Sequence, residues 1–126
     1  MRNGIFSIAT FLPLSLPVML AHAQGDPVEG KSQFAQCTAC HTIEAGAASP
    51  VGPNLHGVFG RKAGSTAGFV YSDAMKASGI VWDEAKLDAY ITKPSAFIPG
   101  NKMAFIGLAK ANVRANIIAY MQAATK

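Results

Sequence analysis

The sequence predicts a small all-α domain in which short helices are joined by long irregular segments. Helical patterns lie near both ends of the chain, at 27–37 and 110–125, and no stretch alternates apolar and polar residues convincingly as a strand. Residues 45–68 are rich in Gly, Pro, Ser and Ala, a composition typical of loops. A domain with so little regular structure needs something besides side chains to fill its interior.

Composition limits the function classes that need to be considered. The chain has 126 residues, which suits one domain, and only 14% of them are charged, which excludes a disordered, charge-rich chain. The net charge of +4 is mild and no basic run occurs, so we expect no nucleic-acid partner. Two cysteines exclude a disulfide-rich scaffold.

The first segment predicts export. Arg2 precedes a mostly apolar stretch at 5–20 that contains two prolines, and Ala21-His22-Ala23 follows it. A basic start, an apolar middle and small residues at the end describe a secretory signal, here cleaved after Ala23. The alternative is an uncleaved anchor, but the stretch is shorter than the about 20 residues that a bilayer span needs. We therefore expect a signal peptide at 1–23 and one domain at 24–126.

The helical pattern near the N-terminus has a recognisable start. Asp26 can cap a helix, Pro27 suits its first position, and Glu29 lies in its first turn. We expect one side of this helix to carry Val28, Gly30, Phe34 and Cys37. Gly30 would cost about 1 kcal/mol relative to alanine inside a helix, unless another helix packs closely against it.

The C-terminal stretch offers that partner. Its apolar residues fall at helical spacing: Val113, Ile117, Tyr120, Met121 and Ala124. A crossing of Gly30 and Phe34 against Ile117 and Tyr120 would satisfy both patterns. Between the terminal helices we expect short helices at 72–78 and 83–92, the second ending before Pro94, and an irregular segment at 94–107.

The strongest chemical signal is Cys37-Thr38-Ala39-Cys40-His41, a C-x-x-C-H motif. Thiols at this spacing can form thioethers with the two vinyl groups of one haem, and the adjacent histidine can bind its iron. Three alternatives remain open. The first is a thioredoxin-like dithiol, although the βαβ context of that motif is missing here. The second is a disulfide between the two cysteines. The third is a zinc site completed by His56, although the usual paired spacing of zinc ligands is missing.

The sixth iron ligand decides what such a haem can do. Met121 belongs to the C-terminal apolar pattern, and Met75 lies in a short helix where an apolar side chain is usually core. Met103 follows Pro99-Gly100-Asn101-Lys102 in a loop, which could aim its thioether at the ring. His56, also in a loop, is the rival ligand, and loop position favours Met103.

A His41/Met103 pair would make the protein an electron carrier and not an enzyme. A soft thioether favours ferrous iron and raises the reduction potential, and occupied axial positions leave no vacancy for oxygen or peroxide. The competing hypothesis is a haem enzyme or a ligand-binding haem sensor, in which the sixth ligand is labile or absent.

The chain resembles class I cytochrome c, the small carriers related to mitochondrial cytochrome c and bacterial cytochrome c2. The resemblance covers residues 25–125, and its motifs occur in the expected order. They are Cys37-x-x-Cys40-His41, Gly52-Pro53-Asn54-Leu55, Gly60-Arg61-Lys62-x-Gly64, Tyr71-Ser72-Asp73-Ala74, Trp82, Tyr90, Pro94, Ile98-Pro99-Gly100 and Lys102-Met103. It implies the cytochrome c fold: crossing terminal helices, with short helices and loops around one haem c bound through Cys37 and Cys40.

The resemblance also implies roles for other residues. The carbonyl of Pro53 would accept a hydrogen bond from the His41 imidazole. Tyr71 and Trp82 would donate hydrogen bonds to a haem propionate, with Arg61 offsetting its charge. The Tyr90 hydroxyl would bond near the Met103 sulfur.

Three departures from the family pattern stand out. Met75 replaces a usual asparagine in a polar network near the haem. Asn101 replaces a usual threonine beside the ligand loop but can still donate, so we expect it among the cofactor-binding residues. The third concerns a ring of lysines around the haem edge. Lys102 and Lys110 persist, whereas other such positions hold Gln36, Ser95 and Ala109. Docking should therefore depend less on salt than in mitochondrial relatives.

By resemblance, the partners would be redox proteins that bind transiently to a monomeric, periplasmic protein peripheral to the membrane. They could be a membrane oxidoreductase complex, a terminal oxidase, a photosynthetic reaction centre or a periplasmic dehydrogenase. A respiratory-chain role would fit this set.

Overall fold

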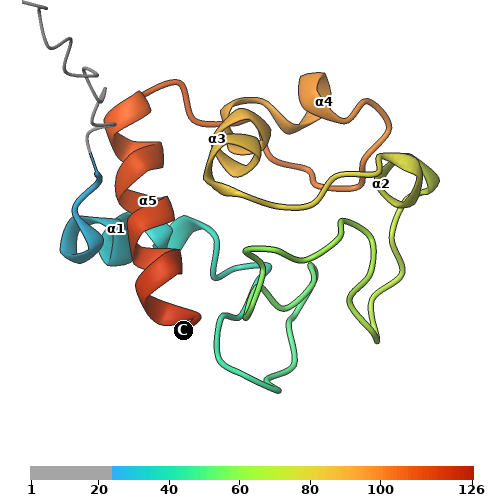
Figure 1. Cartoon of the computed structure of the whole chain (residues 1–126), viewed down its shortest axis with the longest axis horizontal. Coiled ribbons are helices and arrows are strands. Elements are labelled where there is room, and N and C mark those ends of the chain that lie inside the picture. The colour runs from blue at the N-terminus through green and yellow to red at the C-terminus, as the bar shows by residue number, and fades with distance from the viewer. Residues whose placement is uncertain (1–23) are drawn as a thin grey trace, which may run out of the picture.

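A computed structural model describes residues 24–126, and the predicted signal peptide with its cleavage after Ala23 lies outside this range (Figure 1). The described residues are mostly irregular and otherwise helical, as predicted. The helices are α1 (Pro27–Gln33), the 3₁₀ turn η1 (Phe34–Gln36), α2 (Asp73–Ala77), α3 (Glu84–Thr92), α4 (Pro94–Phe97) and α5 (Ala111–Ala124). Within residues 24–126 the chain forms no strand beyond an isolated bridge between Lys62 and Val81.

Helix α1 crosses α5, so the two ends of the described chain pack together (Figure 1). An added Cβ at Gly30 would collide with the backbone carbonyl of Asn116, which shows how closely the helices approach. The rings of Phe34 and Tyr120 lie 5.3 Å apart across this contact. The predicted crossing is therefore confirmed, and it explains the glycine inside α1.

The start of α1 is also as predicted, but one of its apolar residues is not. The Asp26 carboxylate accepts hydrogen bonds from the backbone N–H groups of Val28 (2.8 Å) and Glu29 (3.4 Å). Val28 was expected on the packed side, yet it is 78% exposed. Its position two residues before Gly30 turns it away from α5, because helical residues share a face at spacings of three and four.

The short helices form where their capping residues predict them. The Ser72 hydroxyl accepts from the N–H of Met75 (3.0 Å) and caps α2, and Asp83 accepts from the N–H of Lys86 (2.8 Å) and caps α3. Hydrogen bonds from the backbone N–H and the side chain of Lys86 lower the pKa of Asp83. The expectation that 94–107 is wholly irregular was wrong at its start, because Pro94 opens the single turn of α4.

Arg114 of α5 ties three parts of the fold together. Its Nε donates to the Asp88 carboxylate of α3 at 2.7 Å, and its Nη1 donates to the carbonyls of Leu108 and Ala109 at 2.9 Å each. The segment after Met103 is thereby anchored to both helices. Among residues 24–126, no helix is both long and apolar enough to span a bilayer.

Candidate functional site

A cavity of about 590 Å³ lies inside the fold and is lined by segments from η1 to α5. Much of its wall is apolar, with side chains that include Phe34, Leu55, Val58, Leu87, Ile91, Leu108, Ile117 and Ile118. The regular elements are thus too few to close over one another, and they surround this space instead. The sequence-predicted site residues that line it are Cys37, Cys40, His41, Pro53, Arg61, Tyr71, Trp82, Tyr90 and Met103.

The C-x-x-C-H motif forms a helical turn at the end of η1. The N–H of Cys37 donates to the carbonyl of Phe34 (2.7 Å), and the N–H of His41 donates to the carbonyl of Cys37 (2.9 Å). The two cysteines are not joined in a disulfide, and both line the cavity. Burial, together with the neighbouring Cys40, raises the pKa of Cys37 to about 11, so this thiol stays protonated at neutral pH before it is alkylated.

The imidazole of His41 is held in one orientation. Its Nδ1 lies 2.7 Å from the carbonyl oxygen of Pro53, as predicted. Burial lowers the pKa of His41, which favours the neutral ring despite the opposing effect of the Pro53 hydrogen bond. Because a carbonyl can only accept, Nδ1 carries the proton and Nε2 keeps a free lone pair for a metal.

Gly52 leaves room for that ring, and its substitution should disturb it. An added Cβ would collide with Cε1 of His41, although the backbone at Gly52 is not in the left-handed region. We expect Gly52→Ala to lower the free energy of unfolding by about 1–3 kcal/mol and to alter the haem absorption spectrum. Thermal melts and spectra of the holoprotein test this, with the neighbouring Val51→Ala as control. A wild-type spectrum and melting temperature in Gly52→Ala would contradict the close contact.

Met103 lies in the loop after α4 and also lines the cavity. Its backbone N–H donates to Oδ1 of Asn101 at 2.8 Å, and the hydroxyl of Tyr90 donates to the same oxygen at 3.2 Å. Burial raises the pKa of Tyr90 to about 12, so the hydroxyl remains a donor at neutral pH. Asn101 itself is absent from the cavity wall, and its amide donates to backbone carbonyls.

Arg61, Tyr71 and Trp82 supply the polar part of the wall. The Arg61 guanidinium donates to the carbonyls of His56 and Asn54, both at 3.1 Å, which fixes a positive charge beside the cavity. Neither the Tyr71 hydroxyl nor the Trp82 indole N–H has a hydrogen-bond partner within residues 24–126. Two free donors and a cation at one cavity suit an acidic group such as a propionate.

The structure separates the two rival ligands. His56 does not line the cavity, and its Nδ1 lies 3.1 Å from the carbonyl oxygen of Ile43. In the described part of the chain, no group of three or more His, Cys, Asp or Glu side chains could hold a metal ion, which disfavours the zinc alternative. Met75 is buried and does line the cavity, so it is a second thioether at the site.

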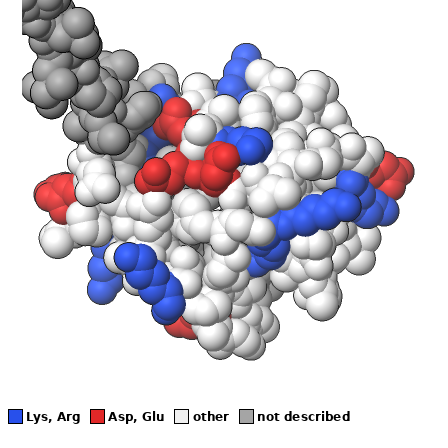
Figure 2. Space-filling view, in the orientation of Figure 1, with Lys and Arg blue, Asp and Glu red and all other residues white. Residues whose placement is uncertain are grey.

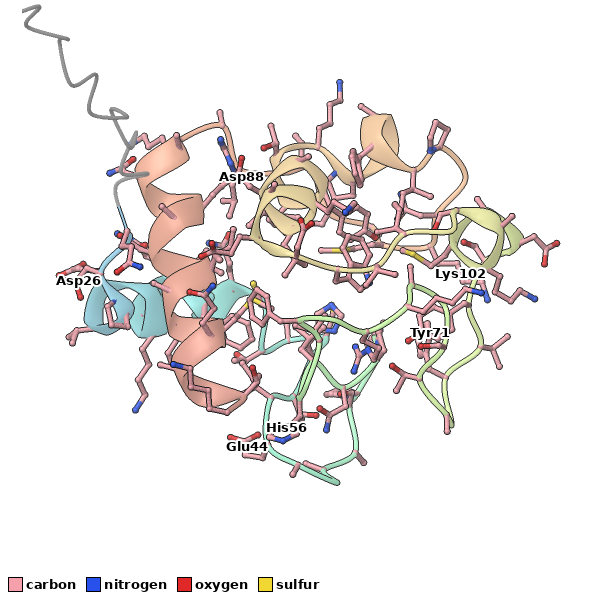
Figure 3. All side chains as sticks on the ribbon, in the orientation of Figure 1. Asp26, Glu44, His56, Tyr71, Asp88 and Lys102 are labelled. Carbon is pink, nitrogen blue, oxygen red and sulfur yellow. The ribbon has the colours of Figure 1, made fainter. Side chains whose placement is uncertain are left out.

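Sequence reasoning gave no role to Gly52 or Asn54, although both lie in a motif that it singled out. Asn54 accepts from the N–H of His56 (2.7 Å) and donates to the carbonyls of Glu44 and Ala47 (2.8 Å each). Asparagine side chains often accept a hydrogen bond from the backbone N–H two residues later and so form a turn. That preference is the signal that could have identified Asn54. Figure 3 shows His56 and Glu44 in the same loop region.

Comparisons with known proteins agree with this geometry. Residues 27–125 match the sequence model of the family described as Cytochrome c. The chain is 52% identical over 101 residues to cytochrome c2 of Rhodomicrobium vannielii, covering 80% of this chain and 81% of that protein. It is 53% identical over 97 residues to cytochrome c2 of Rhodoblastus acidophilus, covering 77% and 91%. Among solved structures it is similar to cytochrome cH from Methylobacterium extorquens, with a TM-score of 0.74, 42% identity, and 79% and 99% of the two chains covered.

Proposed function

Because the chain belongs to the cytochrome c family and is a monohaem electron-transfer protein with one haem c bound through Cys37 and Cys40, we propose that it is an exported carrier whose iron is bound by His41 and Met103. One observation supports the ligand pair above all. His41 and Met103 line the same cavity from segments far apart in the sequence. Each is held by a hydrogen bond: the His41 imidazole donates to the Pro53 carbonyl, and the backbone N–H of Met103 donates to the Asn101 side chain. The rival, His56, does not line that cavity.

The surrounding residues suit an electron carrier. When bound, haem c supplies an iron that changes by one electron between its ferric and ferrous states. The apolar wall excludes water, the Pro53 carbonyl holds the His41 tautomer, and Arg61, Tyr71 and Trp82 provide partners for acidic groups.

A spectroscopic experiment separates the carrier from a haem enzyme or a ligand sensor. We expect the oxidised holoprotein to show the far-red sulfur-to-ferric-iron absorption, and the ferrous protein to bind carbon monoxide only slowly and weakly at neutral pH. Both measurements report whether a thioether occupies the sixth position. Rapid carbon monoxide binding together with no far-red band would contradict the proposal and favour the enzyme or sensor.

Location and partners belong to the same proposal. We expect the protein to be cleaved after Ala23 and to act in the periplasm as a monomer. Its transient partners would be a membrane oxidoreductase complex, a terminal oxidase, a photosynthetic reaction centre or a periplasmic dehydrogenase. The mass of the protein purified from a periplasmic fraction tests this, since it should equal residues 24–126 plus one haem.

The mouth of the cavity carries few charges. Val51 and Val70 line the cavity and are exposed, and Ile106, next to the lining residue Phe105, is 91% exposed. The cavity is lined by two charged side chains, Arg61 and Lys102. Lys102 donates to the carbonyl of Val70 at 3.0 Å and lies beside Tyr71 in Figure 3. Figure 2 shows a largely uncharged face that is crossed on its right-hand side by a band of basic residues. A docking surface of this kind would bind mainly by apolar contact.

Electron transfer to the partner should therefore respond more to apolar contact than to salt. We expect oxidation of the reduced protein by native membranes to slow less than about threefold between 20 and 200 mM salt. Ile106→Ser should slow it about three- to tenfold by removing exposed apolar area from the docking edge. Val28→Ser is the control, because it is a similar apolar-to-polar change at an exposed residue of α1. It should not change the oxidation rate. A salt effect above tenfold, or equal effects of the two variants, would contradict an apolar interface.

A further inference from the structure

We propose that Asn101 is a positioning residue for the sixth iron ligand, because its side chain holds the backbone of Met103 at the cavity wall and ties it to Tyr90 of α3. The inference rests on the proposed role of Met103 as a ligand. It differs from the sequence expectation, which placed Asn101 among the residues that contact the cofactor.

The side-chain amide of Asn101 is completely used. Its Oδ1 accepts from the N–H of Met103 (2.8 Å) and the hydroxyl of Tyr90 (3.2 Å). Its Nδ2 donates to the carbonyls of Pro94 (2.9 Å) and Ile98 (2.8 Å). An amide offers two donors and two acceptor lone pairs, so these four hydrogen bonds fill its capacity. One side chain thus joins α3, the start of α4 and the ligand loop.

The backbone around Met103 is fixed by the same arrangement. The N–H of Asn101 donates to the carbonyl of Ile98 (3.1 Å), which closes a turn whose third residue, Gly100, has φ +86°. The N–H of Phe105 donates to the carbonyl of Met103 (2.9 Å). Both backbone polar groups of Met103 therefore have partners, and the residue has little freedom to leave the cavity wall.

The hydrogen bond of Tyr90 has a chemical consequence. A phenol has one O–H donor, and in this structure that donor points to Asn101. Within residues 24–126 no hydrogen bond reaches the Met103 sulfur. The thioether sulfur has two lone pairs and can bind a metal with or without such a hydrogen bond, so the role of the Tyr90 hydroxyl here is to fix the Asn101 side chain that holds Met103.

Threonine, the usual residue here in class I cytochromes c, cannot reproduce this arrangement. Its hydroxyl has one donor, so it can satisfy the carbonyl of Pro94 or of Ile98, but not both. The loop should then open more often, although the fold outside it is unchanged. Asn101→Thr is for this reason the informative substitution.

Asn54 provides a matched control on the histidine side of the cavity. It makes the same pattern, accepting from the N–H two residues later, at His56, and donating to two backbone carbonyls, of Glu44 and Ala47. It lies in a loop that does not contain Met103. Asn54→Thr should therefore cost similar stability without releasing the sixth ligand.

The experiment measures imidazole binding to the ferric holoproteins, because imidazole competes with Met103 and its apparent affinity reports the open fraction of the loop. We expect Asn101→Thr to raise the imidazole affinity about tenfold, as loss of one to two hydrogen bonds allows. Asn54→Thr should lower the unfolding midpoint about as much as Asn101→Thr does, but it should change the imidazole affinity less than about twofold. Equal changes in imidazole affinity for the two variants, or none for Asn101→Thr, would overturn the proposal.

Tyr90→Phe gives a second test that does not depend on how well Asn101→Thr folds. The change removes one of the four hydrogen bonds of Asn101 and keeps the one to Met103, so we expect the far-red band to remain and the imidazole affinity to rise less than in Asn101→Thr. Loss of the band, or a rise in imidazole affinity as large as in Asn101→Thr, would make Tyr90 the residue that holds Met103 and would overturn the proposal. If wild-type protein itself lacks the far-red band, the ligand assignment fails instead, so the two failures are distinguishable.

Discussion

Replacement of Met103 by alanine should open the sixth coordination position of this protein. We expect the far-red band to disappear, ferrous protein to bind carbon monoxide readily, and the reduction potential to fall by on the order of 0.1–0.2 V. The physical reason is the loss of a soft, uncharged thioether, which stabilises ferrous iron. The loop is fixed through the backbone N–H of Met103 and not through its side chain, so the variant should fold. Spectra and redox titration of the holoprotein measure all three effects.

Met75→Ala is the matched control for this variant. Met75 also lines the cavity with a thioether, is buried, and belongs to α2, away from the ligand loop. Its removal should leave the far-red band in place and cost about 2–3 kcal/mol of stability through lost packing. If the band instead survived in Met103→Ala and vanished in Met75→Ala, the ligand would be Met75.

Gly30→Ala should be strongly destabilising although it adds a single methyl group. At an open helical position this change stabilises a protein by about 0.5–1 kcal/mol. Here the added Cβ would collide with the Asn116 carbonyl and crowd Cβ of Tyr120, so α1 and α5 must move apart. We expect the free energy of unfolding to fall by about 3 kcal/mol. Denaturant unfolding followed by circular dichroism measures it.

Lys31→Ala is the control for that substitution, because Lys31 is the next residue of α1 and is exposed. It tests whether any change in this helix lowers stability, and we expect the free energy of unfolding to change by less than about 0.5 kcal/mol. A Gly30→Ala protein as stable as Lys31→Ala would mean that the helices do not cross as closely as the structure shows.

Local chemistry made much of this fold predictable. Asp26, Ser72 and Asp83 are capping residues with short side chains, so the starts of α1, α2 and α3 could be read directly. Gly30 predicted a close helix partner because a helical glycine is unfavourable without one. The family's covalent haem c was also predictable, from Cys37-x-x-Cys40-His41.

Long-range hydrogen bonds made the rest unpredictable. The choice between His56 and Met103 depends on which loop reaches the cavity, and both lie in loops with similar Gly and Pro content. His56 is held outside the cavity wall by the carbonyl of Ile43, 13 residues earlier in the chain, and no local pattern reveals that contact. The use of Asn101 as a four-bond clamp likewise depends on the carbonyl of Pro94 and on Tyr90, which are distant in sequence.

The crossing of α1 and α5 also bears on how the protein is made. The N-terminal helix finds its partner only when the last residues of the chain have emerged from the ribosome, since α5 ends at Ala124. Until then Cys37 and Cys40, just after η1, belong to a segment without its principal packing. Both thiols therefore remain accessible for haem attachment until α5 has been synthesised, and folding is completed afterwards.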